Sequence, residues 1–186
     1  GRVANKLDLN GPAYTVDAAC ASTLLAVDHA VNALRSRECD AMLAGGVQVS
    51  TPGMVHQAFC YLDALSREGR IAPFSAEASG TLLGQGCGVV VLKRREDAER
   101  DGNRIYACIK GVGMSSDGRG SGLLAPRKEG QELSLQRAYS SSQVDPGTVN
   151  LIEAHGTGIP LGDATEIKTL PSCFPPREGA KPTVAV

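Results

Sequence analysis

Short apolar runs alternate along this chain with longer segments of helical periodicity, and this alternation constrains the fold more than any other feature. Five apolar runs predict β-strands, at residues 12–19, 40–50, 86–94, 104–113 and 148–156. Helices are predicted at residues 21–35, 127–142 and 162–170, with a short polar helix or turn in "REDAERDGN" between two strands. The helix at 21–35 is apolar nearly all round, so we expect it to be buried. Strands alternating with helices predict an α/β fold, in which helices cover a sheet.

Both ends of the chain predict that it is part of a longer domain. It begins at Gly1 rather than at a methionine, and the apolar run "TVAV" is cut off at Val186. The Pro- and Gly-rich stretch at 171–183 predicts a surface loop before that run. Because a strand is a poor place to end a domain, we expect the chain to be truncated there.

Charge and cysteine content exclude several classes of function. The net charge of −1 gives no electrostatic case for binding nucleic acid or an anionic membrane. No run reaches the roughly 18 apolar residues of a membrane helix, and the N-terminal stretch lacks the apolar core of a signal peptide. The six cysteines form no C-x-x-C pair and lack zinc-ligand spacing. We therefore expect free, buried thiols, a cytoplasmic location and no metal site.

Cys20 lies in "VDAACAST", where an apolar run ends and a helix is predicted to begin. A helix N-terminus favours the thiolate, and a sharp strand–turn–helix junction exposes a nucleophile. Small neighbours leave room for a substrate. Taken alone, Cys20 is more easily explained as a buried structural cysteine, because cysteine is among the most buried residues.

A second motif, around His155, favours a catalytic role for Cys20 over a structural one. His155 lies in "EAHGTGIPLGD", just after a predicted strand and among three glycines. Open α/β sheets bind ligands at the carboxyl ends of their strands, in loops of this kind. A cysteine with a histidine is the basic set for acyl transfer through a thioester.

These two motifs, in this order, resemble the β-ketoacyl synthase (ketosynthase) family, which has a thiolase-like layered fold (α-β-α-β-α). The resemblance extends over about residues 3 to 170. Within the family, the motifs are most similar to those of polyketide synthases and polyunsaturated fatty acid synthases. It also rests on the stretches "CDAMLAGGV", "ALSREGRIAPFS", "GQGCGVVVLKR", "RIYACIKGVGMSSDGRG" and "GLLAPRKEGQ".

The resemblance implies a decarboxylative Claisen condensation. Cys20 would accept an acyl group from a carrier-protein thioester, with its own N–H forming part of an oxyanion hole. His155 would stabilise the thioester carbonyl of a malonyl-type extender and assist decarboxylation. Thr157 would contact the phosphopantetheine arm, which belongs to the carrier protein. No other cofactor is implied.

Three positions depart from the family pattern. Ile159 stands where a second threonine usually contacts the phosphopantetheine, so the binding of that arm is expected to be altered. Ser75 follows Phe74 where the family commonly has Asp, and Gln85 replaces an acidic residue in "GQGCG".

Residues 1–186 therefore correspond to a partial ketosynthase domain: the end of its N-terminal half and the start of its C-terminal half. The family's lysine and second histidine, in a "G-S-x-K-x-x-x-G-H" segment, are absent, and Lys181 is too early to match. His29 and His56 are expected to be structural. We expect the isolated chain to be unable to complete condensation.

The resemblance implies an acyl carrier protein, acyl and malonyl-type thioesters and a second copy of the parent chain as partners, without nucleic acid or membrane. Two alternatives stay open. One is a thiolase-type enzyme that acts on coenzyme A esters. The other is a non-catalytic scaffold subunit or fragment, although such relatives generally replace the nucleophile, which is intact at Cys20.

Overall fold

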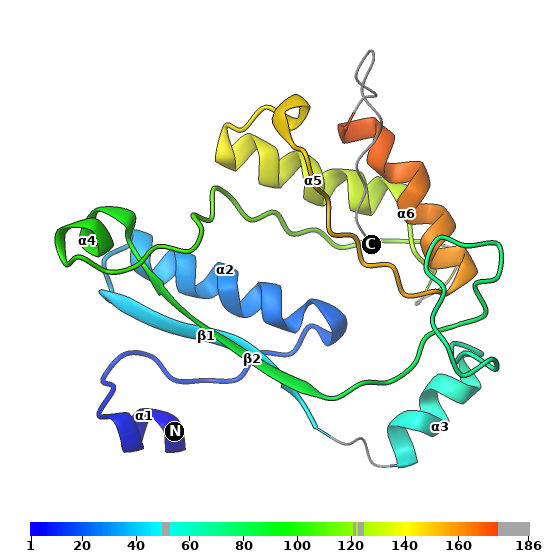
Figure 1. Ribbon diagram of the computed structural model, residues 1–186, viewed down its shortest axis with the longest axis horizontal. Helices are drawn as coiled ribbons and strands as arrows, with labels where there is room; N and C mark the ends of the chain where they lie inside the picture. Colours follow the sequence, from blue (N-terminus) through cyan, green and yellow to red (C-terminus); the bar gives the residue numbers. More distant parts are fainter. Residues whose placement is uncertain (50–52, 121, 123–124, 175–186) are drawn as a thin grey trace. The chain divides into compact units, whose positions relative to one another are not determined.

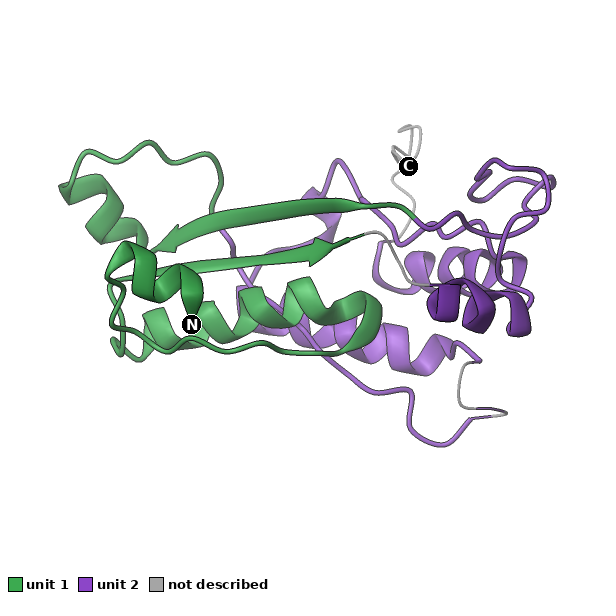
Figure 2. Ribbon diagram, turned by 90° about the horizontal axis from the view of Figure 1, so that it is seen from below, with its two compact units in different colours: residues 1–50, 84–108 green, residues 51–83, 109–186 purple. Residues whose placement is uncertain are grey.

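The computed structural model describes residues 1–49, 53–120, 122 and 125–174, and the chain divides into two compact units (Figure 2). Unit 1 consists of residues 1–50 and 84–108. Unit 2 consists of residues 51–83 and 109–186. Each unit therefore combines two stretches that are far apart in the sequence.

Unit 1 is built on a two-stranded antiparallel sheet with a helix along it (Figure 1). Its elements are α1 (Arg2–Leu7), the 3-10 helix η1 (Ala19–Ala21), α2 (Ser22–Arg35), β1 (Ala41–Gln48), β2 (Gly86–Lys93) and α4 (Arg95–Arg100). The register of the sheet runs from Ala41 opposite Lys93 to Gln48 opposite Gly86. The strands predicted at 40–50 and 86–94, the helix at 21–35 and the polar helix after β2 are thus confirmed.

Two glycines in β1 allow close packing on both sides of the strand. A Cβ at Gly46 would collide with the Thr23 hydroxyl of α2, and one at Gly45 would collide with the Gly88 carbonyl of β2. Glycine has no Cβ, so α2 lies directly against the strand. The small core at this contact contains Ala30, Ala33 and Leu34 of α2 and Ala44 of β1.

The prediction that α2 is buried on all sides is wrong. Only three of its residues are buried, and Leu24 is 66 % exposed. The valines Val89, Val90 and Val91 of β2 are also 51 to 70 % exposed. The reason is the size of the sheet: two described strands cover one face of the helix and leave its other sides open.

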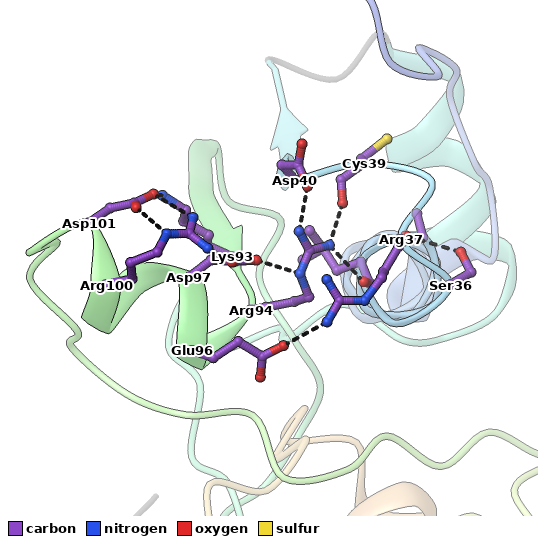
Figure 3. Close-up of polar contacts among 12 residues, drawn as sticks. Ser36, Arg37, Cys39, Asp40, Lys93, Arg94, Glu96, Asp97, Arg100 and Asp101 are labelled. Carbon is purple, nitrogen blue, oxygen red and sulfur yellow. Dashed lines mark hydrogen bonds and ion pairs between the residues drawn. The ribbon is translucent and has the colours of Figure 1, made fainter.

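Arg94 links β2 and α4 to the end of α2 and to the turn before β1 (Figure 3). Its guanidinium donates to the carbonyls of Leu34 at 3.0 Å and Cys39 at 2.7 Å, and its Nε donates to Asp97 at 2.5 Å. It also pairs with Asp40. The side chains of Arg94 and Asp97 are nearly buried, so the bond between them is shielded from solvent, whereas the side chain of Asp40 is exposed.

Unit 2 contains α3 (Gly53–Tyr61), α5 (Lys128–Ser142), the 3-10 helix η2 (Pro146–Thr148) and α6 (Pro160–Cys173). Helices α5 and α6 pack together, and they confirm the helices predicted at 127–142 and 162–170. Thr169, which is 1 % exposed, donates its hydroxyl proton to Gln131 Oε1 at 2.7 Å across this contact.

Three predicted strands, at 12–19, 104–113 and 148–156, are wrong, because the structure forms no β-strand over these residues. An apolar run becomes a strand only when another strand accepts and donates its backbone hydrogen bonds. In the described part of the chain, the strands β1 and β2 meet this condition by pairing with each other.

The loop predicted at 171–183 is partly wrong. Its first three residues continue α6 to Cys173, with Pro171 inside the last turn, where its missing N–H leaves one intrahelical hydrogen bond unformed. Residues 175–183 of that loop, with Lys181 among them, and the "TVAV" run lie outside the described residues.

The six cysteines are all free, as expected, but the prediction that they are buried is wrong. Four are exposed, and Cys39 and Cys173 are half-buried. Burial raises the pKa of the Cys173 thiol, which keeps this cysteine protonated at neutral pH. Among the described helices, none has both the length and the apolar character needed to cross a membrane.

Candidate active site

Cys20 lies in a tight turn that precedes α2, and we call residues 17–22 the cysteine turn. Cys20 is exposed, at the centre of η1. The residue before it, Ala19, has a φ of +50°, in the left-handed region that residues with a Cβ rarely adopt. Such strain persists only where the surroundings hold it, and it is common at functional sites.

Side chains at both ends of the cysteine turn hold this conformation. Asp17 Oδ1 accepts the Ala19 N–H at 2.9 Å. The Ser22 hydroxyl accepts the Ala18 N–H at 2.9 Å and donates to the Ala19 carbonyl at 2.7 Å. The Cys20 N–H takes no part in these bonds. The turn therefore presents the Cys20 thiol and amide on a braced backbone.

The sequence predicted a turn and a helix here, and the structure has both, without the preceding strand. Helix α2 begins at Ser22, two residues after Cys20. The sequence analysis missed the roles of Asp17 and Ser22. Their residue types were the available signal, because Asp and Ser commonly bond backbone amides beside a helix start.

His155 begins a loop, residues 155–159, that ends at the start of α6, and we call it the histidine loop. Glu166 of α6 accepts two of its backbone N–H groups, from His155 at 2.8 Å and from Gly156 at 3.0 Å. The side chain of His155 itself is exposed. One carboxylate thus fixes the backbone at the histidine and leaves the imidazole open to a ligand.

A second carboxylate of α6 holds the far end of the histidine loop. Asp163, which is 4 % exposed, accepts the Gly158 N–H at 3.2 Å and the Phe74 N–H at 2.8 Å. The Gly80 N–H donates to the Gly158 carbonyl at 2.9 Å. Gly158 has a φ of +74°, and a Cβ there would lie 2.8 Å from the Gly80 carbonyl oxygen. Glycine is required at this position for both reasons.

Thr157 lies half-buried between these two anchors. Its hydroxyl accepts the Ile159 N–H at 3.3 Å. Ile159 is the N-cap of α6 and has no side-chain hydrogen bond to the helix, whereas a threonine there would have a capping hydroxyl. Ser75, the other described departure near this loop, accepts the Glu77 N–H at 3.1 Å.

The structure brings His155 and Thr157 into one loop of unit 2, whereas Cys20 belongs to unit 1. Of the other histidines, His29 is half-buried on α2 with its Nδ1 3.1 Å from the Tyr14 hydroxyl, and His56 is exposed on α3. Within the described ranges, no three side chains of His, Cys, Asp or Glu form a group that could hold a metal ion.

The sequence analysis missed Glu166 and Asp163, which hold the backbone of the histidine loop. Both follow His155 at spacings that place them on the first turns of α6, and an acidic residue near a helix start was the available signal. Their bonding partners are backbone amides, which no sequence motif displays.

Comparison with known families matches nearly the whole length of the chain. Residues 1–98 match the model "Beta-ketoacyl synthase, N-terminal domain", and residues 106–186 match "Beta-ketoacyl synthase, C-terminal domain". The junction between the two models lies just after α4.

Among curated proteins, the chain is 44 % identical over 174 residues to a phenolphthiocerol/phthiocerol polyketide synthase polypeptide of Mycobacterium tuberculosis (strain CDC 1551 / Oshkosh). It is 41 % identical over 174 residues to a polyunsaturated fatty acid synthase polypeptide of Thraustochytrium sp.. Each match covers 94 % of this chain. The chain spans only 10 % and 6 % of the length of these two relatives.

Among solved structures, the ketosynthase from module 6 of the bacillaene synthase of Bacillus subtilis 168 superposes with a TM-score of 0.90 at 35 % identity. The PfaC keto synthase–chain length factor superposes with a TM-score of 0.92 at 40 % identity. These matches cover 93 % and 98 % of this chain, and 31 % and 20 % of the solved chains.

Proposed function

Because the chain belongs to the β-ketoacyl synthase family and has its thiolase-like α/β fold, we propose that it takes part in decarboxylative Claisen condensation in polyketide or polyunsaturated fatty acid biosynthesis. Its matches to polyketide and polyunsaturated fatty acid synthases support these two product classes over a thiolase acting on coenzyme A esters. The intact Cys20 speaks against the scaffold alternative.

In the first step, the Cys20 thiolate attacks the carbonyl of an acyl thioester on a carrier protein. A new bond forms between Cys20 Sγ and the acyl carbon, and the bond to the carrier's sulfur breaks. The phosphopantetheine arm leaves as a thiolate, which takes up a proton to become a thiol. During the attack, the Cys20 N–H donates to the oxyanion that develops on the acyl carbonyl.

In the second step, a malonyl-type thioester loses CO₂, and the resulting carbanion attacks the acyl carbon on Cys20. A carbon–carbon bond forms, the bond between the acyl carbon and Cys20 Sγ breaks, and the Cys20 thiolate is released. His155 donates a hydrogen bond to the extender's thioester carbonyl, on which negative charge develops as CO₂ leaves. The anchored backbone at His155 supports this role, because a donor that is already oriented needs no reorganisation. Thr157 contacts the phosphopantetheine arm.

The observation that carries the proposal is the conformation of the cysteine turn. An exposed Cys20, preceded by a left-handed Ala19 and braced by two side chains, is difficult to explain as a structural cysteine. Three other cysteines are exposed as well, so the feature that distinguishes Cys20 is the strained and braced backbone, which a structural cysteine does not need.

The partners in this proposal are an acyl carrier protein and its acyl and malonyl-type thioesters, with a homodimer as the working assembly. The phosphopantetheine arm belongs to the carrier protein, so the chain itself needs no bound cofactor. The six free cysteines support a cytoplasmic location, because disulfides are rare in that compartment.

The experiment that tests the proposal is acylation by an acyl-pantetheine thioester, followed by intact-mass measurement and peptide mapping. We expect one acyl adduct, on Cys20, that is lost in Cys20→Ala. The matched control is Cys60→Ala, which removes another exposed thiol and should keep the adduct. Adducts spread over the exposed cysteines would refute an organised nucleophile site.

A second measurement separates the role of Cys20 in acylation from the role of His155 in decarboxylation. His155→Ala should still form the adduct on Cys20, because acylation does not use the imidazole in this scheme. The rate of CO₂ release from a malonyl-pantetheine thioester should fall in His155→Ala. This substitution is made in a polypeptide that has first been shown to catalyse the release. Equal loss of acylation and CO₂ release in His155→Ala would contradict the separate roles.

A further inference from the structure

The Ser22 hydroxyl bonds two backbone groups of the cysteine turn at once. It accepts the Ala18 N–H at 2.9 Å and donates its proton to the Ala19 carbonyl oxygen at 2.7 Å. The backbone N–H of Ser22 donates to the same oxygen. Two donors from one residue therefore converge on the Ala19 carbonyl.

The Ala19 carbonyl and the Cys20 N–H belong to the same peptide group. The peptide bonds of the described chain are all trans, so this carbonyl oxygen and this N–H point to opposite sides of the bond between them. Bonds that hold the oxygen on one side therefore orient the Cys20 N–H on the other. A hydrogen bond to the oxygen also polarises the peptide and makes the N–H a stronger donor.

This peptide group follows the strained residue of the turn. Ala19 is held at a φ of +50°, from which it would relax if the bonds around it were lost. Relaxation of Ala19 rotates the peptide that carries the Cys20 N–H. Asp17 restrains the N–H of Ala19 on one side, and Ser22 restrains its carbonyl on the other.

From this geometry we propose that Ser22 is a positioning residue for acyl transfer: its hydroxyl orients and polarises the Cys20 N–H that stabilises the oxyanion. The inference rests on the proposed acylation of Cys20. It concerns a residue two positions beyond the nucleophile that never touches the substrate. The hydroxyl acts on the tetrahedral intermediate and leaves the thiol's own nucleophilicity unchanged.

Two reactions of the same thiol distinguish this role from a structural one. Acylation by a thioester passes through an oxyanion, whereas alkylation by iodoacetamide is a direct displacement at carbon without one. Both require the Cys20 thiolate, so a change in its concentration affects both rates equally. Only a defect in oxyanion stabilisation lowers the acylation rate alone.

The test compares Ser22→Ala with the unsubstituted chain, with rates at Cys20 followed by mass spectrometry from about pH 6 to about pH 9. We expect acylation by an acyl-pantetheine thioester to slow about 10-fold in Ser22→Ala. Alkylation by iodoacetamide should change less than about twofold. The backbone N–H of Ser22 still bonds the Ala19 carbonyl in this variant, so the turn itself should persist.

Two further variants complete the experiment. Ser22→Thr keeps a hydroxyl and should keep acylation within about twofold. Ser36→Ala is the matched control, because the Ser36 hydroxyl donates to the Ala33 carbonyl at 3.0 Å at the other end of α2. This control should leave both rates unchanged.

Each result supports or overturns the inference. Acylation that is unchanged in Ser22→Ala, an equal loss of acylation and alkylation, or a roughly 10-fold loss in Ser22→Thr overturns it, while the proposed function stands. Absence of acylation at Cys20 in the unsubstituted chain overturns the proposed function and this inference with it.

Discussion

Substitution of Glu166 by Gln should release the backbone of the histidine loop. The two carboxylate oxygens of Glu166 accept the N–H groups of His155 and Gly156 at 2.8 and 3.0 Å. Glutamine has the same shape but only one acceptor oxygen, and its NH₂ group turns a donor toward the second N–H. Glu166→Gln therefore removes one bond and takes the charge from the other.

The magnitude follows from the kind of bond. A hydrogen bond to a charged group contributes about 1.5 to 3 kcal/mol, and a neutral one about 1 kcal/mol. Loss of one charged bond, together with neutralisation of the other, should make local opening of the loop easier by about 2 to 3 kcal/mol. This corresponds to an increase of about 30- to 150-fold in the population of the open loop.

Amide hydrogen exchange measures this opening directly. The exchange rates of the His155 and Gly156 amides should rise about 30- to 150-fold in Glu166→Gln, while amides in α5 stay protected. Glu129→Gln is the matched control, because Glu129 is a largely exposed residue of α5 whose ion pair contributes little. Unchanged exchange at both amides in Glu166→Gln would refute the assignment of Glu166 as the anchor of the loop.

Three further predictions concern stability. Gly158→Ala should lower the free energy of unfolding by about 2 to 4 kcal/mol in denaturant titrations, because it combines a left-handed φ with a collision against the Gly80 carbonyl. Ile159→Thr should raise it by about 0.5 to 1 kcal/mol, because the new hydroxyl caps α6. The third prediction concerns the loss of folding stability at acid pH. The Arg100 guanidinium, and then a lysine of β2, lower the pKa of Asp101 to about 2, so its folded-state pKa lies below its unfolded value near 3.8. This stabilisation is fully present above about pH 4 and is lost as the pH falls towards 2, and Asp101→Asn should show a weaker decline when unfolding is followed over that range.

These three predictions have separate controls. Gly53→Ala has open space around its new Cβ and should not reproduce the loss seen at Gly158. Ile159→Val lacks a hydroxyl and should give no gain, so an equal gain in both variants would reject capping as the cause. A decline in stability between about pH 4 and about pH 2 that Asp101→Asn leaves unchanged would mean that other carboxylates dominate.

The helices of this chain could be predicted well from its sequence. The periodicity that predicted residues 21–35, 127–142 and 162–170 is local, since each helix makes its hydrogen bonds within itself. Their observed counterparts α2, α5 and α6 differ from these ranges by no more than three residues at either end. The strands were predicted less well, because a strand needs a partner elsewhere in the chain.

The residue types of the candidate site could also be predicted from the sequence. Cys20 beside a helix start and His155 among glycines are local patterns, and their order along the chain carries the family resemblance. The left-handed backbone conformation of Ala19 could not be predicted from the sequence, because an alanine gives no indication of a positive φ. It depends on the bonds that Asp17 and Ser22 make to the turn.

The sequence by itself determined the helices and the two chemical groups of the candidate site, because both depend on neighbours along the chain. Only the tertiary structure decided which carboxylates hold the histidine loop. Asp163 accepts the N–H groups of Gly158, five residues away, and of Phe74, 89 residues away. Glu166 accepts the N–H group of His155, 11 residues before it. A carboxylate bonds whichever N–H groups the fold brings within about 3 Å of it, and that proximity is a property of the packed chain.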